Sequence, residues 1–395
     1  MHTRTIAIIG GGPAGAKAAE KLAQGWGLRS QGGGPRVLVF EEKIGWEKPC
    51  GGGLSHKALR RYPFLAQAAG GGKLLHDAEF LAPSGAAMRF HLREPLAVYS
   101  RATLNQLLLR RAEDAGAEIV ADRILRVRRK DAGWEIASRQ QTYRADFVVL
   151  AAGARTRLRQ TLTEDFHSRD FMLTLGYYLP IACEVLRVQF YENFEGYAWA
   201  FPRPDHVSVG ICGKAAEEPM AGLRDRLEAF MRKHGYAPDP QRIFSHLLPS
   251  LSVESWDGLR LAGQGWALVG DAAGLVDPIT GEGIYYAMRS GDLVAEALLE
   301  GFPELYPERV GNEFGRSLAL GARLARMFYH GEFLGGGVTT RMIEFGAESR
   351  KFLEVIQDLV EGSQSYLGLM ARLHVELVRT LVETGVGRLR ARQNL

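Results

Sequence analysis

The sequence predicts an α/β protein with a Rossmann-type dinucleotide-binding domain, a β-rich second domain and a C-terminal helical region. The first observation is an apolar run, 5–9, that leads into a glycine-rich turn at 10–15 and then into a helical pattern. The second is a pair of continuous apolar runs, 147–150 and 266–269, typical of strands that are buried on both faces of a parallel sheet. The third is the helical spacing of apolar residues from about 307 to 394.

The glycine-rich turn follows the G-x-G-x-x-G pattern of dinucleotide-binding sites. Gly10 permits the tight bend, Gly12 lets the backbone approach a pyrophosphate, and Gly15 lets the following helix lie close to the strand. The first N–H groups of that helix favour a bound phosphate. The next apolar strand ends at Glu41, whose carboxylate suits the hydroxyls of a ribose. The turn therefore predicts dinucleotide binding.

Composition narrows the class of protein. The chain of 395 residues carries a net charge of +4, which gives no reason to expect nucleic acid as a partner. Its three cysteines, Cys50, Cys183 and Cys212, lie too far apart for a disulfide framework or a metal cluster, and reduced thiols suit the cytoplasm. The predicted first strand leaves no room for a signal peptide, and no apolar run has the length of a membrane span. We therefore expect a cytoplasmic protein, with peripheral membrane contact as an open alternative and no metal site.

The middle of the chain divides into further elements. Ser100 is placed to cap a helix, and residues 118–143 alternate as a small β-meander, while 171–213 are β-rich and aromatic. These patterns predict three domains. Their boundaries are 1–73, 97–160 and 257–300 for a discontinuous cofactor-binding domain, 74–96 and 161–256 for a substrate-binding domain with an antiparallel sheet, and 301–395 for a helical domain.

Four features, in sequence order, distinguish a flavin enzyme from a nicotinamide-dependent dehydrogenase. The glycine turn with Glu41 is the first, and Arg101, whose guanidinium suits a pyrophosphate at a helix start, is the second. The third is the strand end 151–153, whose small residues let the backbone lie against a cofactor. The fourth is Gly270-Asp271 followed by the glycine-rich segment 281–284. Asp271 suits a ribityl hydroxyl, and the helix that begins near 284 directs N–H groups at the flavin O2 carbonyl.

On these residues, about the first 300 positions resemble the p-hydroxybenzoate hydroxylase superfamily of FAD enzymes. The resemblance implies FAD that is bound tightly but without a covalent link. The residues that it implies for FAD binding are Gly10, Gly12, Pro13, Ala14, Gly15, Glu41, Glu42, Cys50, Gly51, Gly52, Arg101, Leu125, Ala152, Gly153, Gly270, Asp271, Pro278, Gly281, Gly283 and Ile284.

Two further motifs resemble the geranylgeranyl reductase family. The segment Lys48-Pro-Cys-Gly-Gly-Gly53 is similar to that family's cysteine loop, which implies that Cys50 faces the flavin and acts as a proton donor or gate. The second motif is an aromatic strand, and the residues implied to bind substrate are Tyr197, Trp199, Phe201, Pro202 and Gly210. Cys212 stands where the family has a second glycine. Ordinary packing of a core strand and a buried inert thiol remain the structural alternatives for the two motifs.

The resemblance implies an FAD-dependent reductase that saturates C=C bonds of prenyl chains in lipids, chlorophyll precursors or quinones. A flavin-dependent monooxygenase or halogenase is the alternative, because halogenases carry a similar aromatic strand; no halogenase-like lysine context is evident, since Lys48 precedes Pro-Cys instead. A flavin-binding protein that acts on a protein partner is a third possibility. The electron donor stays open between NADPH, ferredoxin and another reduced carrier, because the stretch after Gly153 lacks the Asp-Gly typical of NAD(P)H users.

Two basic segments have unassigned roles. Arg155, Arg157 and Arg159 suit a phosphate or an acidic partner, or form a solvated basic face. The predicted C-terminal helices carry an apolar stripe flanked by arginines, which suits either an anionic membrane or a cap over the other domains. The stripe and its flanks are Leu373, Leu377, Val378, Leu381, Arg379, Arg388, Arg390 and Arg392.

Overall fold

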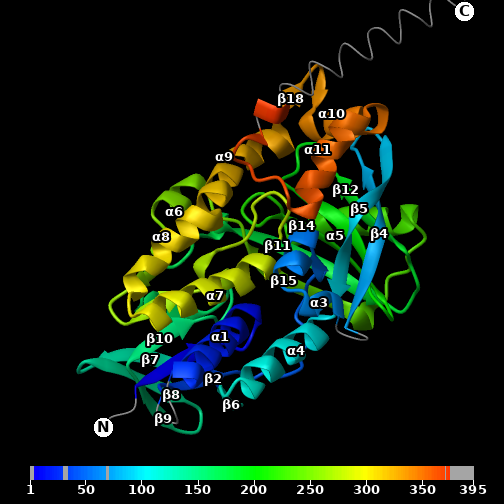
Figure 1. Cartoon of the computed structure of the whole chain (residues 1–395). Helices are drawn as coiled ribbons and strands as arrows, with labels where there is room; N and C mark the ends of the chain where they lie inside the picture. The colour runs from blue at the N-terminus through cyan, green and yellow to red at the C-terminus, as the bar shows by residue number, and fades with distance from the viewer. Residues whose placement is uncertain (1–3, 30–33, 68–70, 370, 374–395) are drawn as a thin grey trace, which may run out of the picture. The chain divides into compact units, whose positions relative to one another are not determined.

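The computed structural model describes residues 4–29, 34–67, 71–369 and 371–373 (Figure 1). They belong to two compact units, each assembled from separate stretches of chain. The first unit comprises Met1–Cys50, Ser100–Met172 and His246–Ala322, and the second comprises Gly51–Tyr99, Leu173–Ser245 and Arg323–Leu395.

The first unit is built on a six-stranded sheet in the order β16-β17-β10-β1-β2-β6. Its strands are β1 (Thr5–Ile9), β2 (Arg36–Phe40), β6 (Glu118–Val120), β10 (Phe147–Leu150), β16 (Ala262–Gly263) and β17 (Trp266–Leu268). Neighbouring strands run parallel, except that β16 is antiparallel to β17. The apolar residues of β1 and β10 are buried, as expected for a parallel sheet that is covered on both faces. The predicted Rossmann-type fold is confirmed.

The strand register brings several chain segments to one edge of this sheet. Ile9 lies beside both Phe40 and Leu150, and Leu150 lies beside Leu268. Because these strands are parallel and end level with one another, the loops that follow them begin at the same edge. Ligands of open α/β sheets bind at this carboxyl edge.

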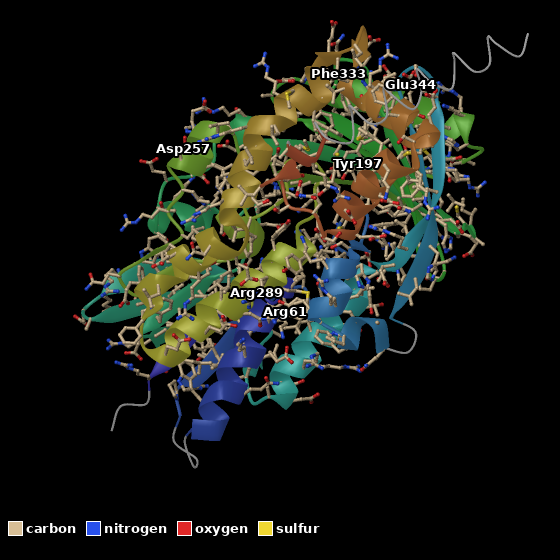
Figure 2. All side chains as sticks on the ribbon, turned by 45° about the horizontal axis from the view of Figure 1, so that its top comes forward. Arg61, Tyr197, Asp257, Arg289, Phe333 and Glu344 are labelled. Atoms are coloured by element: carbon tan, nitrogen blue, oxygen red, sulfur yellow. The ribbon has the colours of Figure 1, made fainter. Side chains whose placement is uncertain are left out.

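Three helices of the first unit lie together. They are α1 (Pro13–Arg29), α4 (Arg101–Asp114) and α7 (Ile284–Glu300), and α1 packs against both of the others (Figure 1). The approach of α7 to α1 depends on Gly291, where a Cβ atom would overlap the carbonyl oxygen of Ala14. Arg289, on the same helix, is buried among carboxylates (Figure 2).

The expected β-meander is present in the first unit as a separate three-stranded antiparallel sheet. It consists of β7 (Ile124–Lys130), β8 (Gly133–Ser138) and β9 (Thr142–Ala145). The unit also contains α6 (Val253–Asp257), α8 (Tyr306–Val310) and the short helical turns η1 (Arg157–Thr161), η2 (Ser168–Asp170), η4 (Gly270–Ala273), η5 (Pro303–Leu305) and η6 (Gly311–Gly315).

The second unit is built on an eight-stranded sheet in the order β15-β11-β14-β13-β12-β4-β5-β3. Its strands are β3 (Gly53–Leu54), β4 (Gly72–Leu81), β5 (Ala87–Tyr99), β11 (Phe171–Leu179), β12 (Val185–Phe190), β13 (Gly196–Pro202), β14 (Val207–Lys214) and β15 (Ile243–Pro249), of which β11 and β15 begin or end in the first unit. The sheet is mixed, because β12 is parallel to β4 while β13 is antiparallel to β12 and β14. The expected antiparallel sheet is therefore largely, but not wholly, antiparallel.

Each face of this sheet is covered by helices. One face packs against α5 (Met220–Lys233) through Ala198 and Ala200 of β13. The other face packs against α10 (Val338–Glu348) and α11 (Arg350–Glu361), and receives the aromatic side chains of the same strand, Tyr197 and Phe201. Alternation along β13 thus separates small residues from aromatic ones. The other elements of the unit are α2 (His56–Arg61), α3 (Phe64–Gln67), η3 (Pro240–Arg242), β18 (Glu332–Phe333) and β19 (Gly336–Gly337).

The helices after residue 300 divide between the two units. Residues up to 322 belong to the first unit and those from 323 belong to the second, so that α9 (Arg316–His330) contributes to both. This division differs from the predicted separate helical domain at 301–395, and packing is the reason. Tyr306 is buried in the first unit, where its hydroxyl donates to Leu268 O. Ile343 and Phe352 are instead buried against the eight-stranded sheet of the second unit.

Two expectations concern membranes. Among the described residues, no helix has both the length and the apolar character needed to cross a bilayer. Leu373, the first residue of the predicted C-terminal stripe, packs against the core of the second unit, which is what the cap alternative expects at this position. The rest of the stripe, Leu377, Val378 and Leu381, and the flanking Arg379, Arg388, Arg390 and Arg392 lie outside the described residues.

Candidate cofactor site

The turn after β1 has the geometry that its glycines predict. Gly10 has φ +107°, and a Cβ atom there would overlap the carbonyl oxygen of Ala151. At Gly15, a Cβ atom would overlap the carbonyl oxygen of Gly10, so only glycine lets α1 begin this close to the turn. Pro13 and Ala14 form the first residues of α1. The turn is therefore tight, and its backbone is exposed toward the sheet edge.

Two glycines at this edge face open space instead. A Cβ atom at Gly12 or at Gly153 would meet no other atom within 4 Å. Ala152, which precedes Gly153, is half-buried. Free space beside backbone N–H groups at the start of a helix is what a bound pyrophosphate requires. The residues present therefore fit a dinucleotide cofactor.

We expect Gly12→Ala to raise the dissociation constant of FAD at least about tenfold, because the added methyl group occupies space that the pyrophosphate needs. The fold should be unaffected, since the new Cβ meets nothing in the chain itself. Gly27→Ala on α1 is the matched control, because it also adds a Cβ where there is no neighbour within 4 Å. Titration of the two apoproteins with FAD measures the difference, and equal affinities would contradict the assignment.

Glu41 is held in place by backbone donors. Its carboxylate accepts hydrogen bonds from Gly11 N and Lys43 N, both at 2.8 Å. A carboxylate has about four acceptor sites, so lone pairs remain for ribose hydroxyls. Glu42 lies 3.7 Å from Arg123 in a loose ion pair, and Leu125 lies on β7 with a side chain 55% exposed. The roles of Glu42 and Leu125 therefore rest on the resemblance alone.

The start of α4 differs from expectation in one respect. Ser100 occupies the N-cap position, but its side chain makes no capping hydrogen bond to the helix and donates to Glu47 instead. Glu47 is the group that caps the helix, because it accepts from Arg101 N at 2.9 Å and Ala102 N at 3.0 Å. The negative charge of Glu47 also interacts favourably with the positive N-terminus of the helix dipole. Glu47 is more than fifty positions from α4, so no local pattern could reveal it.

Arg101 is buried, with 4% of its surface exposed. Its Nη2 donates to Asn105 Oδ1 at 3.3 Å, while its Nε is buried without a hydrogen-bond partner among the described atoms. A buried guanidinium with an unsatisfied donor costs free energy unless an anion binds it. This orphaned donor fits a pyrophosphate, as the sequence predicts.

Asp271 is paired with a lysine that the sequence analysis did not assign to the site. Lys48 Nζ donates to Asp271 Oδ2 at 2.7 Å, with side chains 20% and 14% exposed. Burial works to raise the pKa of Asp271, but the charge and hydrogen bond of Lys48, with Arg101, outweigh it and hold that pKa below its ordinary value. Asp271 is therefore an ionised acceptor, as a contact with ribityl hydroxyls requires.

The surroundings of Asp271 carry an excess of positive charge. Burial lowers the pKa of His246 to about 3, and the charges of Lys48, Arg155 and Arg101 add to this effect while Asp271 opposes it. The imidazole is therefore neutral at physiological pH. Lys48 and Arg101 act on both Asp271 and the neutral His246, and Arg155 acts on His246. This excess of positive charge over one carboxylate favours an anionic ligand such as a dinucleotide.

The loop before α7 is fixed by its own hydrogen bonds. Asp277 accepts from Ile279 N and Thr280 N at 2.9 Å, and Gly281 N donates to Asp277 O, which encloses Pro278 in a tight turn. Gly283 then takes the N-cap position of α7 and has no side chain that could cap the helix. The positive N-terminus of α7, which begins at Ile284, favours a bound anion.

Gly270 also has a structural reason to be glycine. Its φ is +57°, its N donates to Ser290 Oγ at 3.0 Å, and a Cβ atom there would lie 2.9 Å from the Cβ of Ala14.

Arg159 supports the turn at Gly270, because its Nε donates to Ala272 O at 3.2 Å. The guanidinium of Arg159 is buried and lies 3.8 Å from the centre of the Phe166 ring. A solvated basic face is therefore wrong for Arg159, although Arg155 and Arg157 are exposed.

The glycines after Cys50 approach an aromatic ring of the second unit. Added Cβ atoms at Gly51 and Gly53 would lie 2.6 and 3.2 Å from the ring of Phe201. Gly52 has φ +86°, and a Cβ atom there would overlap the carbonyl oxygen of Tyr99. These contacts within the unit explain the three glycines without a ligand. Cys50 itself is half-buried.

The aromatic strand β13 carries its three rings on one face. Tyr197 and Phe201 have ring centres 6.2 and 6.4 Å from that of Trp199. Trp199 is 4% exposed and lies over Gly210, where a Cβ atom would overlap the indole, while Tyr197 and Phe201 are half-buried. Pro202 is buried at the end of the strand.

Cys212, which replaces a glycine of the family motif, lies opposite Tyr197 in the strand register. Burial raises the pKa of its thiol to about 12. Because the reactive form of cysteine is the thiolate, Cys212 is an inert packing residue rather than a nucleophile.

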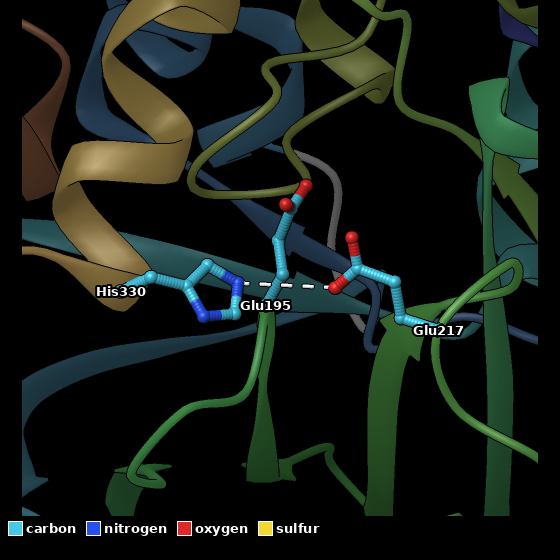
Figure 3. Close-up of side chains that lie close together, drawn as sticks. All are labelled: Glu195, Glu217 and His330. Atoms are coloured by element: carbon cyan, nitrogen blue, oxygen red, sulfur yellow. Dashed lines mark ion pairs between the residues drawn. The ribbon is translucent and has the colours of Figure 1, made fainter.

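The second unit also contains a cluster of a histidine and two glutamates. His330 Nε2 is 3.8 Å from Glu217, and Glu195 lies beside them (Figure 3). Lys214 Nζ lies 3.4 Å from Glu195 and supplies its countercharge. Ion pairing thus accounts for the burial of this carboxylate.

Comparison with known proteins points to flavoenzymes. A family profile described as FAD dependent oxidoreductase matches residues 54–296. The chain is 28% identical over 329 residues to chloroplastic geranylgeranyl diphosphate reductase of Oryza sativa, covering 75% of this chain and 66% of that protein. It is 27% identical over 370 residues to menaquinone reductase of Mycobacterium tuberculosis, covering 83% and 85%. The chain thus spans just under two thirds of the length of the rice protein.

Solved structures share the fold. A geranylgeranyl bacteriochlorophyll reductase-like protein from Thermoplasma acidophilum superposes with a TM-score of 0.75 at 21% identity, covering 94% of this chain and 99% of the other. A flavin-dependent brominase superposes with a TM-score of 0.72 at 18% identity, covering 96% and 100%. At these identities the similarity shows the fold and does not separate a reductase from a halogenase.

Proposed function

Because this chain belongs to the FAD-dependent oxidoreductase family, we propose that it is an enzyme that uses FAD to saturate C=C bonds of prenyl chains. The observation that carries the proposal is the pair of names among its relatives, geranylgeranyl diphosphate reductase and menaquinone reductase. The molecules in both names contain a prenyl chain. The cysteine loop at 48–53 and the aromatic strand β13 support the same substrate class.

Bound FAD would supply hydride to the alkene and be reduced again by an external donor. The chain's own residues would position it: Glu41 at the ribose, Arg101 and the backbone at Gly12 at the pyrophosphate, and Asp271 at the ribityl hydroxyls. The N-terminus of α7 would stabilise negative charge on the reduced ring. FAD would thus be held by residues from separate segments of the first unit.

An unactivated alkene has no carbonyl to stabilise an anion, so we propose that protonation produces cationic character at the more substituted carbon. The faces of Tyr197 and Phe201, which are half-buried, would contact the prenyl chain and stabilise that charge. Cys50 is the proposed proton donor or gate. Thiols are weak acids for the protonation of an alkene.

The electron donor in this proposal is NADPH or a reduced carrier such as ferredoxin. A prenyl lipid is held in a membrane, so the proposal includes peripheral contact with the bilayer. The described residues contain no spanning helix, so a surface contact is the form that we propose.

Oxygen separates the proposed reductase from the halogenase alternative. With dithionite as reductant and no oxygen, the holoenzyme should add one H2 to each saturated bond of geranylgeranyl diphosphate or a menaquinone, as measured by mass spectrometry. Free FAD with dithionite is the control, because it lacks the positioned alkene. Turnover that requires oxygen and incorporates halide or an oxygen atom would establish the alternative.

A further inference from the structure

Two neighbouring residues, Glu47 and Lys48, contact two different parts of the candidate FAD site. Glu47 holds the start of α4 through Arg101 N and Ala102 N. Lys48 reaches the Gly270-Asp271 turn, 223 positions further along the chain. This dipeptide therefore connects the arginine expected at the pyrophosphate to the aspartate expected at the ribityl chain.

The Lys48–Asp271 pair differs from an ordinary surface ion pair. Their side chains are 20% and 14% exposed, whereas the Arg36–Glu118 pair of the same unit has side chains 50% and 49% exposed. Exposed pairs of the second kind contribute little, whereas removing one partner of a partly buried pair leaves a charge that water solvates less well. Glu47 restrains the backbone immediately before Lys48, so the lysine reaches Asp271 from an anchored position.

We propose that Lys48 is a positioning residue for FAD that orients the Asp271 carboxylate toward the ribityl chain and keeps a positive charge beside the cofactor. This proposal rests on the FAD site of the proposed function. It assigns two measurable effects to Lys48. The lysine raises FAD affinity through Asp271, and it raises the flavin midpoint potential because a nearby cation favours the reduced, more negative flavin.

The test compares Lys48→Met, which keeps the length and loses the charge, with Lys48→Arg, which keeps the charge. Lys48→Met should weaken FAD binding about 10- to 100-fold and lower the midpoint potential, while Lys48→Arg should recover most of both. Lys130→Met is the control, because Lys130 pairs with Glu135 on the meander and is exposed. Fluorescence titration gives the affinity, and anaerobic titration against a redox dye gives the potential.

The outcomes separate this proposal from the proposed function. A wild-type protein that does not bind FAD overturns the FAD site itself. A wild-type protein that binds FAD, together with a Lys48→Met variant of equal affinity and potential, overturns only the role of Lys48. If Lys48→Met does not fold, the Lys48→Met/Asp271→Asn double variant removes both charges and should fold. Because Asp271→Asn alone is expected to weaken FAD binding, the double variant is compared with Asp271→Asn: a lower midpoint potential in the double variant supports the proposal, and equal potentials contradict it.

Discussion

Replacing Asp271 with alanine should weaken FAD binding about 10- to 100-fold, because a charge-assisted hydrogen bond is worth about 1.5–3 kcal/mol. The carboxylate is placed for this contact. Its Oδ2 accepts from Lys48, and its Oδ1 lies 3.5 Å from where a Cβ atom added to Gly283 would be, at the start of α7. Its pKa lies below the ordinary value, because the lysine outweighs burial. The carboxylate therefore stays ionised down to acidic pH, and the difference in affinity should persist from pH 8 to pH values near about 5.

Two further variants define what Asp271 contributes. Asp271→Asn keeps an acceptor oxygen and loses the charge, so its affinity should lie between those of the wild type and the alanine variant. Asp257→Ala removes an exposed aspartate at the end of α6 in the same unit and should change nothing (Figure 2). Titration of the four apoproteins with FAD tests the order. Wild-type affinity in Asp271→Ala would remove this residue from the cofactor site.

Replacing Arg289 with methionine should lower the free energy of unfolding of the first unit by about 3–5 kcal/mol, as expected when one partner of a buried ion pair is lost. Arg289 is buried and bridges three carboxylates. Its Nη2 donates to Glu313 at 2.7 Å and its Nη1 to Glu296 at 3.2 Å, and Asp292 lies 3.6 Å away. Burial works to lower the pKa of Arg289, but these carboxylates outweigh it and raise that pKa. Calorimetry of the apoprotein measures the change.

Arg309→Met provides the matched control for Arg289. Arg309 pairs with Glu300 in the same region, but their side chains are 24% and 47% exposed, so its loss should cost less than about 1 kcal/mol. Adding Glu313→Leu to Arg289→Met should recover part of the stability, because it removes one of the carboxylates left without a partner. Equal unfolding temperatures for Arg289→Met and Arg309→Met would show that the buried network is not important for stability.

The sequence was sufficient for the parts of the site that follow from local pattern. The Rossmann-type sheet and the tight turn at Gly10 were predictable, because continuous apolar strands and required glycines leave few alternatives. Arg101 and Asp271 were predictable as charged residues at the start of a helix and at the end of a strand. The structure adds a buried, partly unsatisfied guanidinium and an ionised carboxylate at these two positions.

Contacts between distant segments were not predictable. Glu47 caps a helix more than fifty residues away, and no local periodicity indicates this. The approach of Gly51 and Gly53 to the ring of Phe201 joins segments about 150 positions apart, and the glycine run itself gives no sign of that partner. The same limitation applies to the helices after residue 300, because amphipathic spacing shows that a helix has a buried face but does not show which sheet covers it.

The discontinuous first unit also imposes an order on folding during synthesis. Its central strand β1 pairs with β10, and its edge is extended by β17, so the sheet is incomplete until residue 268 has left the ribosome. The face of α1 that packs against α7 is covered later still, because α7 extends to Glu300. Contacts between segments this far apart in sequence form slowly. The nascent chain therefore exposes the part of α1 that packs against α7 until Glu300 has been made, a period in which a chaperone that shields this helix would increase the yield of folded protein.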